Sequence, residues 1–399
     1  MSTFAIDDAT ARRTALILAF AQALGGAAPS IVVALGGLVG TTLASDPSLA
    51  TLPVSVFQLG LAAGTIPAAM MMRRFGRRSG YLLGATTGIL AGSVAAGGIA
   101  LASFAVFCLG TFMSGFYAAY VQSYRFAAAD TASEAFRPRA ISWVMTGGVL
   151  AGVVGPQTVI WTRDLTPDAP FAGGFLGQAA LALCSLALLA CLRHVPPPPR
   201  TGMASGRPLR EIMAQPRFQI AVVTGLVSYG LMSFLMTAAP VAMVAECGHS
   251  LASATLGIQW HILAMYGPSF FTGRIISRFG TERVIVAGLL LIAAAAAVGL
   301  AGITVAHFWV ALVLLGVGWN FSFIGATTLV TTCYRPEERT KTQAANDFLV
   351  FGSVAIASFS SGKLLSLGGW VTVNWLALPP IAIVLVLLLA TSRTRSAPA

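Results

Sequence analysis

The sequence predicts an all-α integral membrane protein with twelve transmembrane helices in two pseudo-symmetric six-helix bundles. Three observations predict it: the composition, a series of long apolar segments, and a basic turn that occurs twice. Of the 399 residues, 56% are hydrophobic and 9% are charged, whereas soluble domains carry roughly 25% charged residues. So few charges cannot cover a soluble core, and the 42 glycines favour close packing of helices within a bilayer.

The apolar segments are each close to the roughly 20 residues that cross a bilayer. Their approximate bounds are 14–37, 52–72, 81–103, 105–125, 140–161, 172–192, 218–243, 252–276, 283–304, 308–331, 342–363 and 369–391. The longest polar connection falls at the midpoint and contains the run Pro196–Pro199, which cannot be helical. We therefore expect an N-terminal bundle over 1–193, a cytoplasmic linker over 194–217 and a C-terminal bundle over 218–399.

A short basic turn separates the second apolar segment from the third, and a similar turn follows the eighth. The first is Met72–Arg78 and the second is Ser277–Arg283, and both contain Arg-Phe-Gly. The two turns lie about half the chain apart, which indicates one structural unit used twice.

The charge distribution predicts orientation. If the N-terminus is inside the cell, only Arg163 and Lys363 of the 24 Lys and Arg residues fall outside. We therefore expect a multi-pass protein of the inner (plasma) membrane with both termini cytoplasmic. The net charge of +11 is spread over short loops without interleaved aromatic residues, so no nucleic-acid partner is predicted. The expected partners are the lipid bilayer and a small-molecule substrate, and a monomer is expected.

These residues together resemble the Major Facilitator Superfamily along essentially the whole chain. The family signature after the second span is Gly-x-x-x-Asp-Arg-x-Gly-Arg-Arg. Its Arg-x-Gly core stands at 74–76 and again at 278–280, while Arg73 and Ser277 replace the Asp. The resemblance implies a secondary transporter that works by alternating access, with a gate near these turns. The gating or coupling candidates are Arg73, Arg74, Arg77, Arg78, Arg278, Asp130 and Asp347.

Two further resemblances bear on the substrate and on the direction of transport. The stretches Met236–Met243 and His261–Gly280 look like a bacterial subgroup of the superfamily, in which some members are linked to vitamin uptake, riboflavin among them. The glycines that lead to Gly155-Pro156 look like part of the family's antiporter signature, whose ending is missing here. These glycines otherwise serve close helix packing. Uptake of a neutral aromatic or vitamin-like solute is thus the first hypothesis, and efflux of drugs or metabolites by an antiporter is the alternative.

Polar and aromatic residues at mid-depth supply candidates for the substrate site, because such groups are costly to place in lipid. The candidates are Gln22, Gln58, Tyr117, Tyr120, Tyr229, Thr237, His261, Trp319 and Asn320. For the tyrosines of the fourth span the alternative is helix packing. For His261 the alternative is a hydrogen-bonded core residue.

Asp347 is the carboxylate that we place within a span. It is either the proton carrier of a symporter or antiporter, or a lock that pairs with the first basic turn. Asp130 is expected to serve the same basic cluster.

The sequence favours a transporter over an enzyme and over ATP-driven transport. It contains no P-loop, HExxH or GxSxG motif, and its five cysteines form no CxxC pair. We therefore predict no catalytic residues, no metal and no cofactor, and an intramembrane enzyme is the less favoured class.

Overall fold

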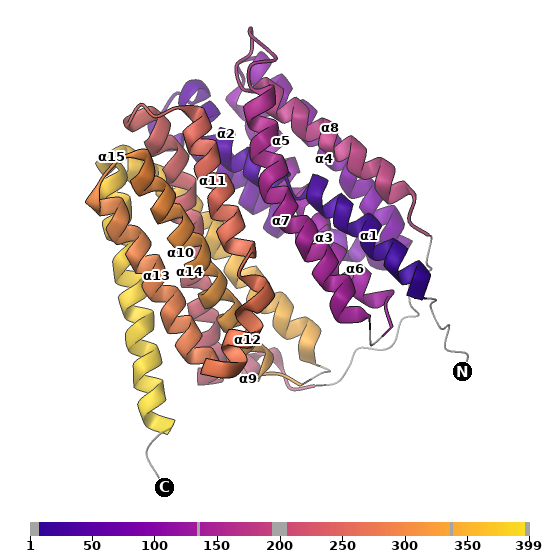
Figure 1. Cartoon of the computed structure of the whole chain (residues 1–399), viewed down its shortest axis with the longest axis vertical. Helices are drawn as coiled ribbons and strands as arrows, with labels where there is room; N and C mark the ends of the chain where they lie inside the picture. The colour runs from indigo at the N-terminus through magenta and orange to yellow at the C-terminus, as the bar shows by residue number, and fades with distance from the viewer. Residues whose placement is uncertain (1–7, 134–135, 194–205, 336–337, 396–399) are drawn as a thin grey trace. The chain divides into compact units, whose positions relative to one another are not determined.

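The computed structural model describes residues 8–133, 136–193, 206–335 and 338–395, and these form helices without any strand (Figure 1). The chain divides into two compact units, which are Met1–Pro199 (unit 1) and Arg200–Ala399 (unit 2). Each unit is built from long apolar helices joined by short loops, as the spacing of the apolar segments predicts.

The helices of unit 1 pack through glycines that allow close approach. Its elements are α1 (Asp8–Gly25), α2 (Ala28–Leu43), η1 (Pro47–Leu49), α3 (Leu52–Phe75), α4 (Arg77–Ala100), α5 (Phe104–Gln122), α6 (Tyr124–Asp130), α7 (Arg137–Thr162) and α8 (Ala172–Ala190). Helix α1 packs on α7, α3 on α5, and α4 on both α5 and α8. A Cβ at Gly115 of α5 would overlap the carbonyl oxygen of Phe57 on α3, so only glycine permits this crossing.

Unit 2 repeats this arrangement. Its elements are α9 (Leu209–Met213), α10 (Pro216–Val241), η2 (Ala242–Glu246), α11 (Leu251–Tyr266), α12 (Ser269–Phe279), α13 (Thr281–Ala301), α14 (Val305–Thr331) and α15 (Arg339–Arg395). Helix α10 packs on α15, α11 on α14, and α13 on both α14 and α15. These are the pairings of unit 1 taken in the same chain order. The prediction of an all-helical fold made from two similar bundles is therefore confirmed.

The number of membrane crossings follows from where the helices break. Ten helical stretches of the described residues are long and apolar enough to span a bilayer. The pair α11–α12, interrupted at Gly267 and Pro268, is not among them because each part is short. Helix α15 holds two crossings, separated at Gly369, where φ is 65°. With these two adjustments the helices agree with the twelve crossings expected.

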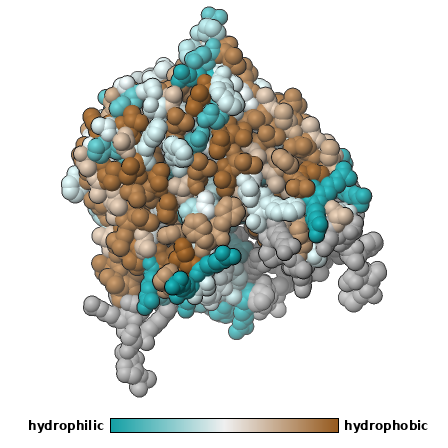
Figure 2. All heavy atoms as spheres, in the orientation of Figure 1, coloured by the Kyte–Doolittle hydropathy of each residue, from teal (hydrophilic) through white to brown (hydrophobic). Residues whose placement is uncertain are grey.

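Apolar side chains cover the outer faces of the helices. In unit 2, Leu290, Ile383 and Val386 expose 54%, 60% and 64% of their surface, which in water would be unfavourable and in lipid is not. Figure 2 shows apolar residues along the middle of the helices and hydrophilic residues toward their ends. The protein is a multi-pass membrane protein.

Candidate functional site

Five aromatic side chains from four helices of unit 2 meet and form what we call the aromatic cluster. Its members are Tyr229 on α10, Tyr266 on α11, Trp319 and Phe323 on α14, and Phe351 on α15. Trp319 and Phe323 are four residues apart and share a face of α14, so their rings stack at 14° with centroids 5.1 Å apart. The Tyr229 ring lies 5.3 Å from the Trp319 ring and 5.0 Å from the Phe323 ring.

The aromatic cluster is only partly covered by protein. Tyr229, Tyr266, Phe323 and Phe351 are half-buried, whereas Trp319 is 7% exposed. The indole N–H of Trp319 is buried and meets no hydrogen-bond acceptor among the described residues. A buried donor without a partner is unfavourable, and buried indole N–H groups usually find one. The cluster can therefore stack on a planar ring and donate one hydrogen bond to it.

Asn320, the neighbour of Trp319, has its amide fully engaged by the protein. Its Nδ2 donates to the carbonyl oxygen of Met265 at 2.6 Å and to Ser269 Oγ at 2.7 Å. Its Oδ1 accepts from Thr272 Oγ1 at 2.6 Å. These three partners flank the break at Gly267–Pro268, where the helical hydrogen bonds are interrupted. Asn320 thus clamps α14 to the break between α11 and α12, and the solute contact predicted for it stays a prediction.

His261 and Thr237 are also engaged with protein groups. His261 is fully buried on α11, and its Nδ1 lies 2.7 Å from the carbonyl oxygen of Leu312 on α14. Thr237 Oγ1 on α10 lies 3.1 Å from Ser358 Oγ on α15. Both contacts join helices within unit 2. The prediction that these two side chains contact the substrate stays a prediction.

The candidates of unit 1 lie within its helix packing. Tyr117 and Tyr120 are each 1% exposed. Their rings lie against Gly88 and Gly84 of α4, where a Cβ would come within 2.6 Å of ring carbon atoms. Gln58 is buried on α3 and Gln22 is half-buried on α1. These are packing contacts between helices of unit 1, and the prediction that the two tyrosines contact the substrate stays a prediction.

The two basic turns share one backbone conformation. Gly76 has φ 83° and ψ 160°, and Gly280 has φ 87° and ψ 149°, a region that only glycine enters without strain. In each turn the arginine before the phenylalanine places its guanidinium over that ring, with Arg74 at 5.2 Å and Arg278 at 5.3 Å. The internal repeat therefore extends to the geometry of single residues.

Of the remaining gating candidates, three arginines lie at the first basic turn and Asp347 lies on α15. Arg73 is exposed, Arg77 Nη1 donates to Tyr81 Oη at 3.3 Å, and Arg78 Nη2 donates to the carbonyl oxygen of Ala190 at 2.9 Å. Asp347 is exposed on α15 and accepts a hydrogen bond from the amide of Asn346 at 3.1 Å. The side chain of Asp130 lies outside the described residues.

Sequence reasoning missed a buried ion pair in unit 2. Glu338, which is 0% exposed, accepts hydrogen bonds from Arg207 Nη2 at 2.7 Å, from Arg207 Nε at 2.9 Å and from the backbone N–H of Arg335 at 2.9 Å. The hydrogen bond from the Arg207 guanidinium, followed by that from the Arg335 N–H, holds the pKa of the Glu338 carboxyl well below its usual range. Lys341 Nζ adds a hydrogen bond to the Arg207 carbonyl at 2.5 Å. Residues of the predicted linker are thereby fixed to the loop between α14 and α15.

No metal centre is present within the described residues, where no three His, Cys, Asp or Glu side chains gather in a way that could hold an ion. The described cysteines are free thiols. The described groups of the candidate site are therefore aromatic rings and hydrogen-bonding groups.

Comparison with known proteins gives consistent results. The family model of the Major Facilitator Superfamily matches residues 15–269 and 221–399. The chain is 58% identical to the riboflavin transporter RfnT of Brucella anthropi over 395 residues, which is 98% of this chain and 99% of that protein. It is 30% identical to the uncharacterized MFS-type transporter YddS of Bacillus subtilis, covering 89% of this chain and 85% of YddS. The crystal structure of the nucleoside transporter NupG matches with a TM-score of 0.73 at 14% identity, covering 96% of this chain and 100% of NupG.

Proposed function

This chain belongs to the Major Facilitator Superfamily, and we propose that it is a secondary transporter that takes up riboflavin. The observation that carries the proposal is the 58% identity to RfnT along nearly the whole of both chains. The name describes RfnT, and that this chain carries the same solute is our proposal, which the aromatic cluster also supports.

The aromatic cluster supports a flavin as the solute. Riboflavin has a flat three-ring system with two carbonyl groups, so it offers both a stacking face and hydrogen-bond acceptors. The half-buried rings of Phe323 and Tyr229, which pack against the buried Trp319 ring, provide an aromatic surface for the flat face. The buried indole N–H of Trp319 has no partner among the described residues, so it can donate a hydrogen bond to a carbonyl oxygen of the flavin ring. Ring stacking on an aromatic side chain contributes about 1–3 kcal/mol.

The experiment is riboflavin binding by purified protein, followed by quenching of flavin fluorescence. We expect Trp319→Ala to raise the Kd about 5-fold to 150-fold, because it removes the ring against which the stacking rings of Phe323 and Tyr229 pack. Trp319→Phe keeps a ring and removes the N–H, so its Kd should rise less, about 2-fold to 13-fold. Trp309→Phe is the matched control on the same helix, since its N–H donates to the Ser253 carbonyl at 2.9 Å.

Transport is measured in proteoliposomes loaded with buffer and supplied with labelled riboflavin outside. Absence of riboflavin uptake by the wild-type protein would refute the proposed substrate. Uptake by the wild type with unchanged Kd in Trp319→Ala would instead remove the aromatic cluster from the site. Transport of labelled riboflavin measured in vesicles of inverted orientation distinguishes uptake from the efflux alternative.

We further propose that the protein is a monomer of the inner membrane with both termini in the cytoplasm. The proposed organisation is a bundle over 1–193, a cytoplasmic linker over 194–217 and a bundle over 218–399. Asp347→Asn separates the two roles considered for that carboxylate. If solute exchange is altered and proton-driven accumulation persists, Asp347 serves the gate; intact exchange without accumulation makes it the proton carrier.

A further inference from the structure

An open groove runs along α1 of unit 1, at the end where that helix begins. It has a volume of about 720 Å³, and we call it the arginine groove. Its lining consists of two arginines near the beginning of α1 and of small or apolar side chains: Ala9, Arg12, Arg13, Leu16, Ile17 and Phe20 of α1, and Leu188 of α8. Cations followed by apolar side chains complement a phospholipid, whose phosphate head group is followed by its acyl chains.

The spacing of these residues places them on one face of α1. Arg12, Leu16 and Phe20 follow one another at intervals of four, so they form a stripe along the helix axis. From Arg12 to Phe20 the helix rises about 12 Å, at 1.5 Å per residue. That length is most of the roughly 15 Å that one leaflet contributes to the hydrocarbon core. The groove therefore matches one acyl chain in depth.

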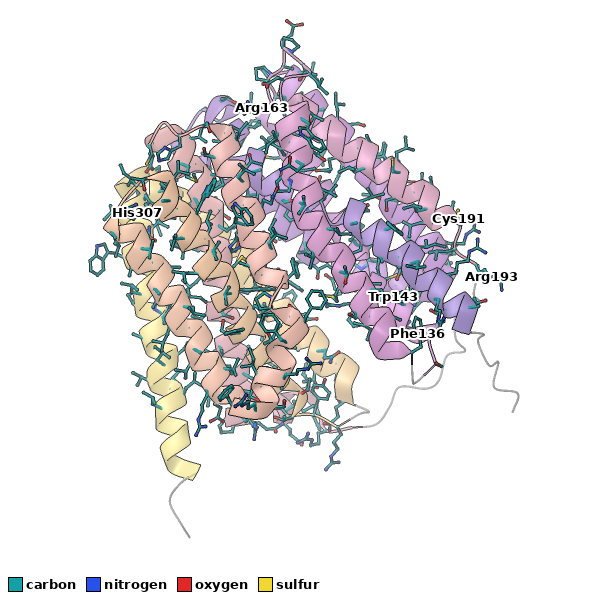
Figure 3. All side chains as sticks on the ribbon, in the orientation of Figure 1. Phe136, Trp143, Arg163, Cys191, Arg193 and His307 are labelled. Carbon is teal, nitrogen blue, oxygen red and sulfur yellow. The ribbon has the colours of Figure 1, made fainter. Side chains whose placement is uncertain are left out.

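Arg12 is positioned by an aromatic side chain at the beginning of α7. Its guanidinium lies 5.7 Å from the centroid of the Phe136 ring, and Phe136 itself packs edge-on against Trp143 at 5.4 Å. Figure 3 shows Phe136 and Trp143 beside the first turns of α1, and Arg193 at the nearby end of α8. The cation–π contact orients the guanidinium without neutralising it.

The charge at the groove mouth is not balanced by described acidic side chains. Arg12 and Arg13 are both exposed, and neither forms an ion pair with a carboxylate among the described side chains. Arg78 adds a further cation at the same end of unit 1 by donating to the Ala190 carbonyl of α8 at 2.9 Å. We propose that the arginine groove holds one anionic phospholipid, with its phosphate at Arg12 and Arg13 and an acyl chain along Leu16, Phe20 and Leu188.

The lining decides between an anionic lipid and the other occupants of such a groove. A free inorganic anion would gain nothing from Leu16, Ile17 and Phe20. A zwitterionic lipid would fill the apolar part equally well, but it brings no net charge to the two arginines. Each arginine near a membrane surface favours an anionic lipid about fivefold, so the pair should select anionic lipid clearly.

The experiment is native mass spectrometry of the delipidated full-length protein. Phosphatidylglycerol and phosphatidylethanolamine with identical acyl chains are added in equal amounts, and retained lipid is counted. We expect the wild type to retain phosphatidylglycerol at least fivefold over phosphatidylethanolamine. Arg12→Gln combined with Arg13→Gln should bring this ratio close to one, and Arg13→Lys alone should keep it.

Arg163→Gln is the control, because it removes one cation at the end of unit 1 that lies opposite the arginine groove. Arg163 follows the last residue of α7 and Phe136 precedes its first residue, and Figure 3 shows them at opposite ends of unit 1. We expect this variant to keep the wild-type ratio. Three results would overturn the proposal: a double variant that keeps its preference, an equal loss in Arg163→Gln, or displacement of the lipid by inorganic phosphate. The Arg13→Lys variant keeps the test informative if the double variant does not fold.

Discussion

Asn320→Ala tests whether the buried amide of α14 is a clamp or a contact with the solute. The substitution removes three hydrogen bonds, to the Met265 carbonyl, Ser269 and Thr272. Thr272 keeps a second acceptor in the Pro268 carbonyl at 2.8 Å, so the loss falls chiefly on the Met265 carbonyl. A buried acceptor left without a donor costs about 1–3 kcal/mol, and single interhelical hydrogen bonds in membranes contribute about 0.6 kcal/mol on average. We therefore expect the free energy of unfolding to fall by about 1–3 kcal/mol.

The assay is equilibrium unfolding of unit 2 helices in detergent micelles, followed by tryptophan fluorescence, with flavin binding measured on the same sample. Ser322→Ala is the matched control, because its hydroxyl is buried two residues further on α14 and donates to the Gly318 carbonyl of its own helix at 2.7 Å. Its free energy of unfolding should change by less than about 0.5 kcal/mol. If Asn320→Ala is as stable as Ser322→Ala while its flavin Kd rises tenfold or more, the clamp interpretation is wrong and Asn320 contacts the solute.

Two other positions give equally direct predictions. Gly280→Ala forces a side chain into φ 87°, ψ 149° and should lower the free energy of unfolding by about 1–3 kcal/mol. The control is Gly273→Ala, whose new Cβ meets open space within helix α12, so this variant should be neutral or slightly stabilising. Equal effects of the two substitutions on thermal unfolding would contradict a special role for the turn. Glu338→Gln should lower the melting temperature at pH 7. Since the folded-state pKa of Glu338 is lowered, its contribution is complete above the unfolded value of about 4.3 and is lost as the pH falls further toward the folded pKa. A difference in melting temperature between the wild type and Glu338→Gln that persists below the folded-state pKa of Glu338 would contradict this ion pair.

The helical fold could be predicted from the sequence because its cause is local. Each span is recognisable by its own apolar run, and the two Arg-Phe-Gly turns mark the repeat without any knowledge of contacts. The breaks inside two predicted spans were also visible in principle, at Gly25-Gly26 and at Gly267-Pro268. Glycine and proline at such points interrupt helical hydrogen bonds, although these spans were predicted as continuous.

Partners that are distant in the chain could not be predicted in this way. Glu338 is a carboxylate in a mixed-charge loop by sequence, and its burial depends on Arg207, 131 residues away in the chain. The sequence analysis does not single out Phe323 and Phe351, because a single sequence does not show that their rings meet Tyr229. By sequence, Tyr229 and Trp319 are both candidates for the substrate site because they are aromatic residues at mid-depth. That their rings meet is a result of the structure, and their contact with a solute stays a proposal.

Trp319 and Asn320 show how one helix can separate support from recognition. Consecutive residues of an α-helix point about 100° apart, so adjacent side chains on α14 serve different neighbours. Asn320 uses its whole amide on the break between α11 and α12, which fixes the helix that carries Tyr266. Trp319 stacks within the aromatic cluster and keeps its N–H without an acceptor among the described residues. A donor held in place by a fully satisfied neighbour loses little freedom when an acceptor arrives. On this reasoning the clamp at Asn320 lowers the cost of the hydrogen bond that we propose Trp319 donates to the flavin.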